Sequence, residues 1–374
     1  MKVESICLRE LRMRLKSPFE TSVGVTQDRR ILLVEIVCDG VSGWGEITAG
    51  ETPSFNSETT ETAWHVVSEF IAPRLAGKQL DFARDFPTLF AGIRGHQMAK
   101  AGVENALWDA EAKQANVPLA KLIGGTLERI ACGVSLGIRS DAKALVATVE
   151  KELASGYRRI KLKIKPGKDL EFVAAVRHAF PEILLSVDAN SAYTLADTPH
   201  LKRLDQFNLL MIEQPLGWDD IYSHARLQGQ LETAICLDEC ITNAQHAASA
   251  LELRACRIIN IKLGRVGGHT EARKVHDVCR SVGIPVWCGG MLEAGVGRAH
   301  NIAMSALPGF TLPGDVSASQ RYWHEDIIEP EVTVSPDGTI AVSGEPGIGC
   351  AVRRELVETL TVRRRDWKPG SITA

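Results

Sequence analysis

Five short apolar runs in the middle of the chain each end in a charged residue, and these endings recur at a nearly constant interval. The charged residues are Lys163, Asp188, Glu213, Asp238 and Lys262, so successive endings lie 25, 25, 25 and 24 residues apart. One strand, one helix and two short connections fit into about 25 residues. The interval therefore predicts repeated strand–helix units, which build a parallel sheet.

The residues within each run also alternate consistently. Aliphatic residues such as Leu162 and Val187 alternate with polar ones such as Lys161 and Ser186. Successive side chains of a strand point to opposite faces, so one face is suited to packing against helices. The other face, at the carboxyl ends of barrel strands, can surround a ligand. We expect an α/β fold with a modified (β/α)8-type barrel, in preference to an open doubly wound sheet.

The first part of the chain has a different pattern. Ile6–Leu15 and Ile31–Val37 alternate apolar and polar residues, and Asp39-Gly40 then follows as a hairpin signal. Helical spacing continues from residue 57 to 113. We expect an α+β capping domain over residues 1–125.

Hairpin character returns after about Tyr322. Val332 and Val334 precede a turn at Asp337-Gly338, which Ile340 and Val342 follow. We expect this tail to rejoin the first domain, so that residues 323–374 complete the cap around a barrel domain over residues 126–322.

The composition excludes several classes of partner. With 43 Lys and Arg against 46 Asp and Glu, the net charge is −3, which gives no electrostatic footprint for nucleic acid or an anionic membrane. The chain has no run of about 18 apolar residues, and charges interrupt the apolar runs of its first twenty residues. We therefore expect neither a membrane span nor a signal peptide. Nine cysteines without a Cys-x-x-Cys pair argue against a disulfide scaffold. We expect a cytoplasmic protein with a small-molecule partner.

Three of the five strand endings are carboxylates. Asp188, Glu213 and Asp238 offer hard oxygen ligands, which suit Mg²⁺ or Mn²⁺ and leave coordination positions for a substrate. The alternative is a structural ion-pair network with the neighbouring lysines. Buried charges without a function are costly, which favours the metal site.

Two lysines stand on either side of the three acids in strand order. Lys163 and Lys262 would then approach a bound substrate from opposite sides, an arrangement for two-sided proton transfer. A lysine acts as a base near neutrality when its pKa falls from about 10.4 toward about 7 to 8. Lys161 supplies a neighbouring positive charge, although Lys161-Leu162-Lys163 alone could be a solvated strand edge.

Glycine-rich segments follow two of the predicted strands, at Gly264–Gly268 and Gly289–Gly290. Neither has the spacing of a nucleotide-binding loop, so the glycines either admit backbone N–H groups to an anionic substrate or form turns. Arg265 could hold a substrate carboxylate, tune Lys262, or lie on the surface.

These segments resemble a known group of proteins. The enolase superfamily, in its muconate-lactonizing-enzyme subgroup, is matched by Lys161-x-Lys163, Val187–Asn190, Ile212–Pro215, Leu237–Glu239 and Asn260–Lys262. The N-succinylamino acid racemase/o-succinylbenzoate synthase family is matched by Asn260–Gly268, Gly289–Glu293, Gly297–Asn301 and Pro313–Ser317. The likeness extends almost from end to end.

The resemblance implies a set of residue functions. Asp188, Glu213 and Asp238 are the implied ligands of Mg²⁺ or Mn²⁺, and Lys163 and Lys262 the implied acid/base pair. Lys161 is implied to contact the substrate carboxylate and to influence the lysine pKa. The remaining candidates support the site or contact substrate, and they are Asn190, Glu239, Arg265, Ser135, Gly290, Met291, Phe19 and Ser22. Phe19 to Val25 corresponds to a mobile loop of the cap.

The implied reaction is metal-dependent enolisation of a carboxylate substrate. We expect an N-succinylamino acid (N-acylamino acid) racemase, with o-succinylbenzoate synthesis for menaquinone as the alternative or companion activity. A muconate cycloisomerase or dipeptide epimerase is disfavoured, the latter because Asp315-Val316-Ser317 lacks an Asp-x-Asp pair. A non-enzymatic ligand-binding barrel would not need two opposed lysines. We also expect a homo-oligomer.

Overall fold

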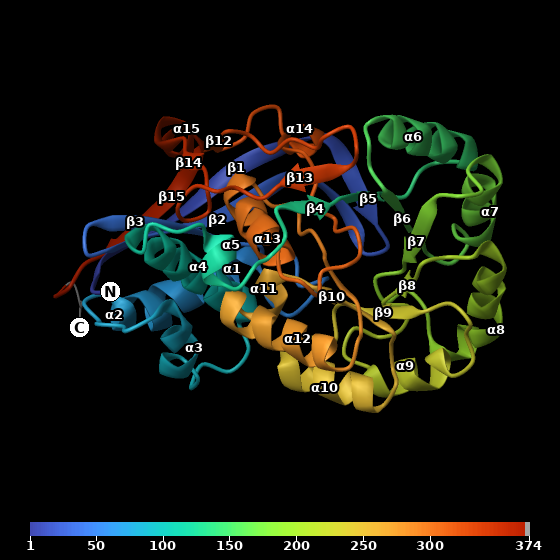
Figure 1. Cartoon of the computed structure of the whole chain (residues 1–374), viewed down its shortest axis with the longest axis horizontal. Coiled ribbons are helices and arrows are strands. Elements are labelled where there is room, and N and C mark those ends of the chain that lie inside the picture. The colour runs from blue at the N-terminus through green and yellow to red at the C-terminus, as the bar shows by residue number, and fades with distance from the viewer. Residues whose placement is uncertain (371–374) are drawn as a thin grey trace.

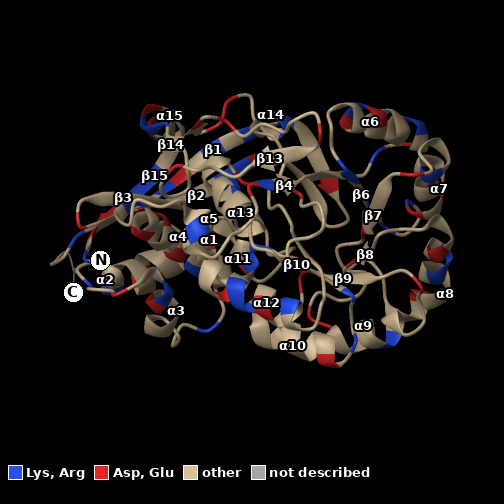
Figure 2. Cartoon of the chain, in the orientation of Figure 1, with Lys and Arg blue, Asp and Glu red and all other residues tan. Residues whose placement is uncertain are grey.

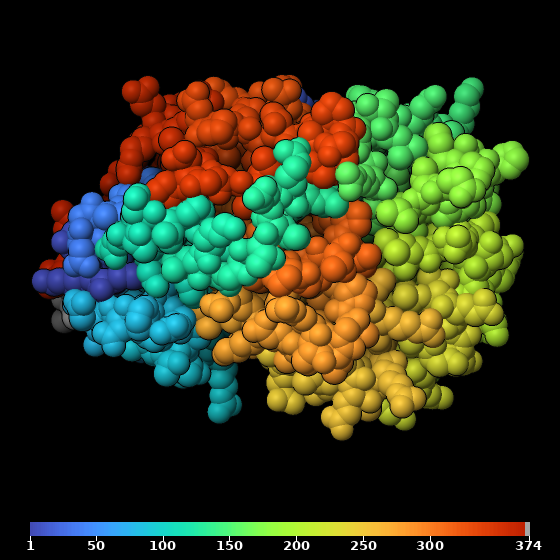
Figure 3. All heavy atoms as spheres, viewed as in Figure 1, coloured from blue at the N-terminus to red at the C-terminus, as the bar shows by residue number. Residues whose placement is uncertain are grey.

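The computed structural model describes residues 1–370 and contains strands from both ends of the chain in one antiparallel sheet (Figure 1). Its strands are β1 (Val3–Thr21), β2 (Gly24–Cys38), β3 (Val41–Ile47) and β15 (Thr361–Trp367). Their order in the sheet is β15-β1-β2-β3. The pairing of β15 with β1 joins the two ends of the chain, and Figure 3 shows C-terminal residues beside the N-terminal strands.

The predicted N-terminal hairpin is confirmed between β2 and β3. Asp39 and Gly40 form its turn with φ angles of 44° and 80°, as the two-residue hairpin connection requires. The loop expected over Phe19–Val25 is instead the tip of the β1–β2 hairpin. Phe19 pairs with Thr26 and Thr21 with Gly24, because the strands continue past the sheet with only a two-residue turn.

Helices cover one face of this sheet. They are α1 (Thr60–Val66), α2 (Ala72–Leu75), α3 (Phe86–Leu89), α4 (Gln97–Gln114) and α5 (Leu119–Leu122), with a π-helical turn at Val67–Ile71 and a 3₁₀ turn at Ala83–Asp85. The side chain of Thr59 accepts a hydrogen bond from Thr62 N and begins α1. The backbone of α4 passes so close to β3 that a Cβ at Gly43 or Gly45 would collide with it.

The central part of the chain forms a seven-stranded parallel sheet in chain order. Its strands are β5 (Gly133–Leu136), β6 (Arg159–Lys163), β7 (Leu184–Asp188), β8 (Ile212–Glu213), β9 (Ile235–Leu237), β10 (Ile258–Ile261) and β11 (Val286–Cys288). The helices outside it are α6 (Ala142–Ala154), α7 (Leu170–Ala179), α8 (Thr198–Leu201), α9 (Ile221–Gln228), α10 (Ala244–Glu252) and α12 (His269–Ser281), with 3₁₀ turns at Leu195–Asp197 and Lys202–Phe207 (Figure 1). The short helix α11 (Leu263–Val266) is buried and packs against α4 of the first domain. The predicted strand–helix repeat is confirmed.

An irregular segment over residues 309–315 joins the two edge strands of this sheet. Val286 N donates to Gly309 O at 3.3 Å and Asp315 N donates to Cys288 O at 2.8 Å, which connects the segment to β11. Gly133 N donates to Gly314 O at 2.6 Å, which connects it to β5. The segment therefore takes the place of an eighth strand, and the expected modified barrel is confirmed in this form.

The C-terminal part differs from its predicted hairpin. The remaining elements are α13 (Gly295–Ser305), α14 (Ser319–Tyr322), β12 (Ile328–Glu329), β13 (Thr339–Ala341), β14 (Ala351–Val352) and α15 (Arg354–Leu360), and β4 is Arg129–Ala131. Val332 and Val334 form no strand, because β13 pairs with β4 instead. The domain boundaries at residues 125 and 323 stay a prediction, and residues 371–374 lie outside the described part.

Charges of both signs are interspersed along the elements rather than gathered by sign (Figure 2). Within residues 1–370, no helix combines the length and the apolar character needed to cross a membrane. The nine cysteines are all free, and eight of them are buried.

Candidate active site

The polar faces of successive barrel strands bring the predicted charged residues together. Lys163 lies beside Asp188 in the register of β6 and β7, and Asp188 lies beside Glu213 in the register of β7 and β8. Asp238 and Lys262 come directly after β9 and β10. All five therefore lie at the carboxyl-terminal mouth of the barrel.

The lysines contact the carboxylates directly. Lys161 Nζ lies 2.8 Å from Glu213 Oε2 and 3.3 Å from Asp188 Oδ2. Lys163 Nζ lies 2.6 Å from Asp188 Oδ2, and Lys262 Nζ lies 2.7 Å from Asp238 Oδ2. The three carboxylates are fully buried. The ion pairs expected for a structural network of lysines and carboxylates are thus present. They join the predicted metal ligands to the lysines predicted to transfer protons.

Asn190 and Glu239 support this cluster. Asn190 Oδ1 accepts a hydrogen bond from Lys163 Nζ at 2.6 Å, and its Nδ2 donates to Glu239 Oε1 at 3.0 Å. Asn190 adopts a left-handed backbone with φ of 42°, which turns its N–H toward Asp188 Oδ1 at 3.0 Å. The other carboxylate oxygen of Glu239 is buried and has no hydrogen-bond partner among residues 1–370.

Arg265 is neither a surface residue nor a substrate-facing one. Its guanidinium is 1 % exposed and forms an ion pair with Asp238. It also donates from Nε to Ile241 O at 2.6 Å and from Nη2 to Asn260 O. The structure does not support the interpretation of Arg265 as a substrate-carboxylate ligand, because its buried side chain is directed to Asp238 and to two backbone carbonyls and lines neither cavity at the cluster. Arg265 and Lys262 share Asp238 as an ion-pair partner, and an influence of Arg265 on Lys262 stays a prediction.

Burial and neighbouring charge shift the pKa values of the cluster. Burial, together with the charges of Asp188 and Asp238, raises the pKa of Glu213 to about 8. Burial disfavours the charged form of Lys262, but the carboxylates around it, led by Asp238, raise its pKa above the usual value. The expected lowering of a lysine pKa by neighbouring positive charge stays a prediction.

The carboxylates have the donor chemistry of a divalent cation site. Asp188, Glu213 and Asp238 offer hard oxygen donors, and the buried unpaired oxygen of Glu239 adds another nearby. Within residues 1–370, no three His, Cys, Asp or Glu side chains are already arranged as a metal site. The ammonium of Lys161 contacts one oxygen each of Asp188 and Glu213, so it would compete with a cation for those oxygens.

Two adjoining cavities open at the cluster. The inner one, of about 50 Å³, is lined by Lys161 and Asp315, and the outer one, of about 480 Å³, is lined by cap residues such as Phe55. Lys163 and Lys262 line both. The two lysines therefore border both cavities, whose linings combine barrel and cap residues.

Most of the remaining candidates also reach this space. Phe19 and Gly290 line both cavities, Ser135 lines the inner one and Met291 the outer one. Ser22 lies at the tip of the β1–β2 hairpin, where its Oγ donates to Asn190 O at 3.3 Å. Phe19 meets Tyr322 edge to face at 6.4 Å between ring centroids.

Comparisons with known proteins agree with this geometry. Residues 144–356 match the family described as "Enolase C-terminal domain-like", and residues 3–124 match "Mandelate racemase / muconate lactonizing enzyme, N-terminal domain". The chain belongs to the enolase superfamily. The predicted resemblance and the prediction of an enzyme are both confirmed.

Relatives of this enolase-superfamily enzyme carry two different names. An o-succinylbenzoate synthase of Geobacillus kaustophilus is 53% identical, with 96% of each chain covered. An N-succinylamino acid racemase of Thermus thermophilus is 47% identical, covering 98% of this chain and 99% of the relative. A solved enolase-superfamily protein from Listeria innocua superposes with a TM-score of 0.94 at 42% identity, covering 98% of this chain and 99% of that one.

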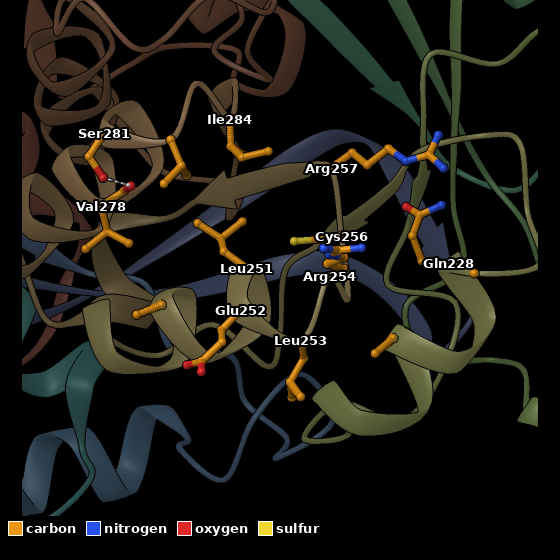
Figure 4. Close-up of a pocket in the computed structure, with 14 residues that line it drawn as sticks. Gln228, Leu251, Glu252, Leu253, Arg254, Cys256, Arg257, Val278, Ser281 and Ile284 are labelled. Carbon is orange, nitrogen blue, oxygen red and sulfur yellow. Dashed lines mark hydrogen bonds between the residues drawn. The ribbon is translucent and has the colours of Figure 1, made fainter.

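A larger cavity of the enzyme lies elsewhere. It measures about 810 Å³ and is lined by α9, α10 and α12, with Leu251, Cys256 and Ile284 among its walls (Figure 4). None of the predicted site residues lines it. Its size exceeds that of the cavities at the lysines, but it lacks their convergent charges, so the barrel mouth is the candidate active site.

Several groups around this candidate site were not among the predicted residues. Asp315 contacts Lys161, Asn260 Nδ2 donates to Glu213 Oε1 at 2.7 Å, and Arg298 and Ser317 line the inner cavity. Another interval of about 25 residues after Cys288 points close to Asp315. The residues around Asp315, however, do not alternate between apolar and polar, so the alternation that identified the other strands was missing there.

Proposed function

We propose that this enzyme racemises N-succinylamino acids by moving a proton at the carbon next to a carboxylate. Lys163 and Lys262 exchange that proton from opposite faces of the substrate, and Lys161 contacts the carboxylate. The same arrangement supports o-succinylbenzoate synthesis as an alternative or companion activity.

The observation that carries the proposal is the placement of the two lysines. Lys163 at the end of β6 and Lys262 after β10 are separated by the three strands that carry the acids, yet both face the same cavity. Each is paired with a different carboxylate, Asp188 or Asp238. A binding protein for a carboxylate would need one buried cation rather than two on opposite sides.

The proton transfer requires different protonation states of the two lysines. In one direction neutral Lys163 removes the α-proton and protonated Lys262 delivers a proton to the opposite face. In the other direction their functions are exchanged. The planar enolate between these steps carries its negative charge on the carboxylate oxygens, where the Lys161 ammonium is available to stabilise it.

Asp188, Glu213 and Asp238 are the proposed ligands of Mg²⁺ or Mn²⁺. The bound cation would stabilise the negative charge on the substrate carboxylate and offset the acids that hold the lysines protonated. Arg265 would weaken the effect of the Asp238 charge on the pKa of Lys262, because both side chains contact that carboxylate.

The inner cavity provides polar groups for the far end of a substrate. The hydroxyl oxygens of Ser135 and Ser317 are buried there without hydrogen-bond partners among residues 1–370. A buried hydroxyl without a partner costs free energy, so a ligand that bonds to it binds more favourably. We infer that the succinyl group extends toward these two serines.

The synthase activity is the second candidate because the relatives named o-succinylbenzoate synthase reach 53% identity. In that reaction one lysine removes the α-proton and then returns it to the leaving hydroxide, which departs as water. The other lysine stays protonated beside the enolate. The two reactions therefore share the first proton transfer.

A parallel assay tests the proposal. With Mg²⁺ present, we expect several N-succinyl-L-amino acids to lose optical rotation, as both enantiomers form. The dehydration substrate is assayed alongside, and Lys163→Ala serves as the matched inactive variant. Rapid dehydration without any loss of rotation would reverse the order of the two activities, and inactivity toward both substrates would refute the proposal.

A further inference from the structure

Lys161 has a third carboxylate partner outside the proposed ligand set. Its Nζ lies 2.6 Å from Asp315 Oδ2, against 2.8 Å from Glu213 and 3.3 Å from Asp188. The side chains of all four residues are buried. One ammonium is thus shared among three carboxylates, and its position decides which carboxylate oxygens are free.

Asp315 is fixed independently of Lys161. Its Oδ1 lies 2.6 Å from Arg159 Nη2, and the Arg159 side chain is 0% exposed. Arg159 Nε donates to Pro313 O at 3.1 Å, and its guanidinium lies 4.7 Å from the centroid of the Trp287 ring. The backbone N–H of Asp315 also bonds to β11. These contacts hold the carboxylate in place beside the cluster.

Two cations keep Asp315 charged despite its burial. Burial opposes ionisation, but Lys161 and Arg159 hold its pKa well below the usual range. The Lys161 ammonium also lies 4.7 Å from the centroid of the Trp287 ring, so an apolar wall borders the position next to Asp315. The Lys161 ammonium thus has a charged partner, Asp315, outside the proposed ligand set.

We propose that Asp315, anchored by Arg159, is a positioning residue that holds the Lys161 ammonium when Asp188 and Glu213 bind a divalent cation. This inference rests on the proposed function, because it assumes that those carboxylates are metal ligands. Without the charge of Asp315, the ammonium would stay on Glu213 and Asp188 and compete with the cation. Supporting groups of this kind commonly change metal affinity by about 10- to 100-fold.

Mn²⁺ binding without substrate tests this directly, with free Mn²⁺ measured by electron paramagnetic resonance. We expect Asp315→Asn to weaken Mn²⁺ binding at least about tenfold. In a Lys161→Met background the same substitution should have little effect, because the competing ammonium is gone. Asp315→Glu, which keeps the charge, should recover most of the affinity.

Asp169→Asn is the matched control. It removes an equally buried carboxylate, bonded to Tyr193 and His200, that does not line the cavities, and it should leave Mn²⁺ binding unchanged. Unfolding curves establish that each variant is folded, and Asp315→Ser replaces the Asn variant if that one is not.

Three outcomes would contradict the inference. An equal loss of affinity in both Lys161 backgrounds would show that Asp315 only maintains the fold, and no loss in either would show that it does not affect the site. A parent protein that binds no Mn²⁺ while it racemises its substrate would overturn the metal site itself, and the inference with it.

Discussion

Glu46 of the antiparallel sheet accepts a hydrogen bond from the backbone N–H of Gly297 at 2.8 Å, across 251 positions of sequence. Its other carboxylate oxygen accepts from Ala294 N at 3.0 Å. The two bonds satisfy donors at the start of α13, directly after the segment that places Gly290 and Met291 in the cavities. A cap residue thus supports one wall of the candidate site.

Glu46→Ala should destabilise the protein. It would leave two buried backbone N–H groups without an acceptor, and we expect the free energy of unfolding to fall by about 2 to 4 kcal/mol. Urea unfolding measures this. Glu355→Ala, on the exposed side of α15, should change the free energy by less than about 0.5 kcal/mol. Equal effects of the two substitutions would contradict the capping function.

Glu104 should make stability decrease as the pH rises. Burial raises its pKa from 4.5 to about 7, so the folded state keeps a proton that the unfolded chain has released. The contribution is complete below pH 4.5 and is lost as the pH rises through 7. The total is about 3.5 kcal/mol, at about 1.4 kcal/mol per pKa unit.

Unfolding of the parent and of Glu104→Gln from pH 5 to 8 isolates this effect. The difference between the two proteins removes the opposite contribution of His269 and His300, whose pKa values burial lowers. We expect the parent to lose more stability than the variant over this range. Parallel curves would contradict the prediction, and exposed Glu128→Gln is the control.

The regular part of the fold and the charged cluster could be predicted because both follow from periodicity. The 25-residue interval and the alternation of Leu162 with Lys161 and Lys163 depend only on strand geometry. Each predicted ending lies at the last residue of its strand or one residue beyond it, as with Asp238 after Leu237.

Long-range pairing and burial could not be predicted in the same way. Asp315 lies in a segment where Pro313 and Gly314 break the strand pattern, so only the closed barrel reveals its contact with Lys161. Val334 has strand character but forms no strand. The strand that follows it, β13, pairs with β4, which lies about two hundred residues earlier in the chain. The burial of Arg265 likewise depends on Asp238 and on backbone carbonyls.

Removal of divalent cations should abolish turnover and lower thermal stability together. Asp188, Glu213 and Asp238 are the proposed ligands, and a cation at 100 times its dissociation constant would stabilise the folded state by about 2.7 kcal/mol. We expect Mg²⁺ to raise the unfolding temperature of the parent but not that of an Asp188→Asn, Glu213→Gln double variant. Full activity after exhaustive chelation would refute the metal site.

Phe19 should affect substrate binding more than proton transfer. Its ring lines both cavities and packs edge to face against Tyr322, and it carries no group that could move a proton. We expect Phe19→Ala to raise KM about tenfold with a smaller change in kcat, since it removes apolar contact of about 1 to 2 kcal/mol. Phe82→Ala, at an exposed position of the cap, is the matched control. A fall in kcat alone would contradict this prediction.

Exchange of the α-proton with deuterium tests the opposed action of Lys163 and Lys262 most directly. Nuclear magnetic resonance would follow N-succinyl-L- and N-succinyl-D-amino acids in D₂O with Lys163→Ala, Lys262→Ala and the control Lys165→Ala. Each site variant should lose exchange of one enantiomer by about 10²- to 10⁴-fold, a different one in each, and keep exchange of the other. Exchange of both enantiomers at the parent rate in either variant would contradict the two-lysine account.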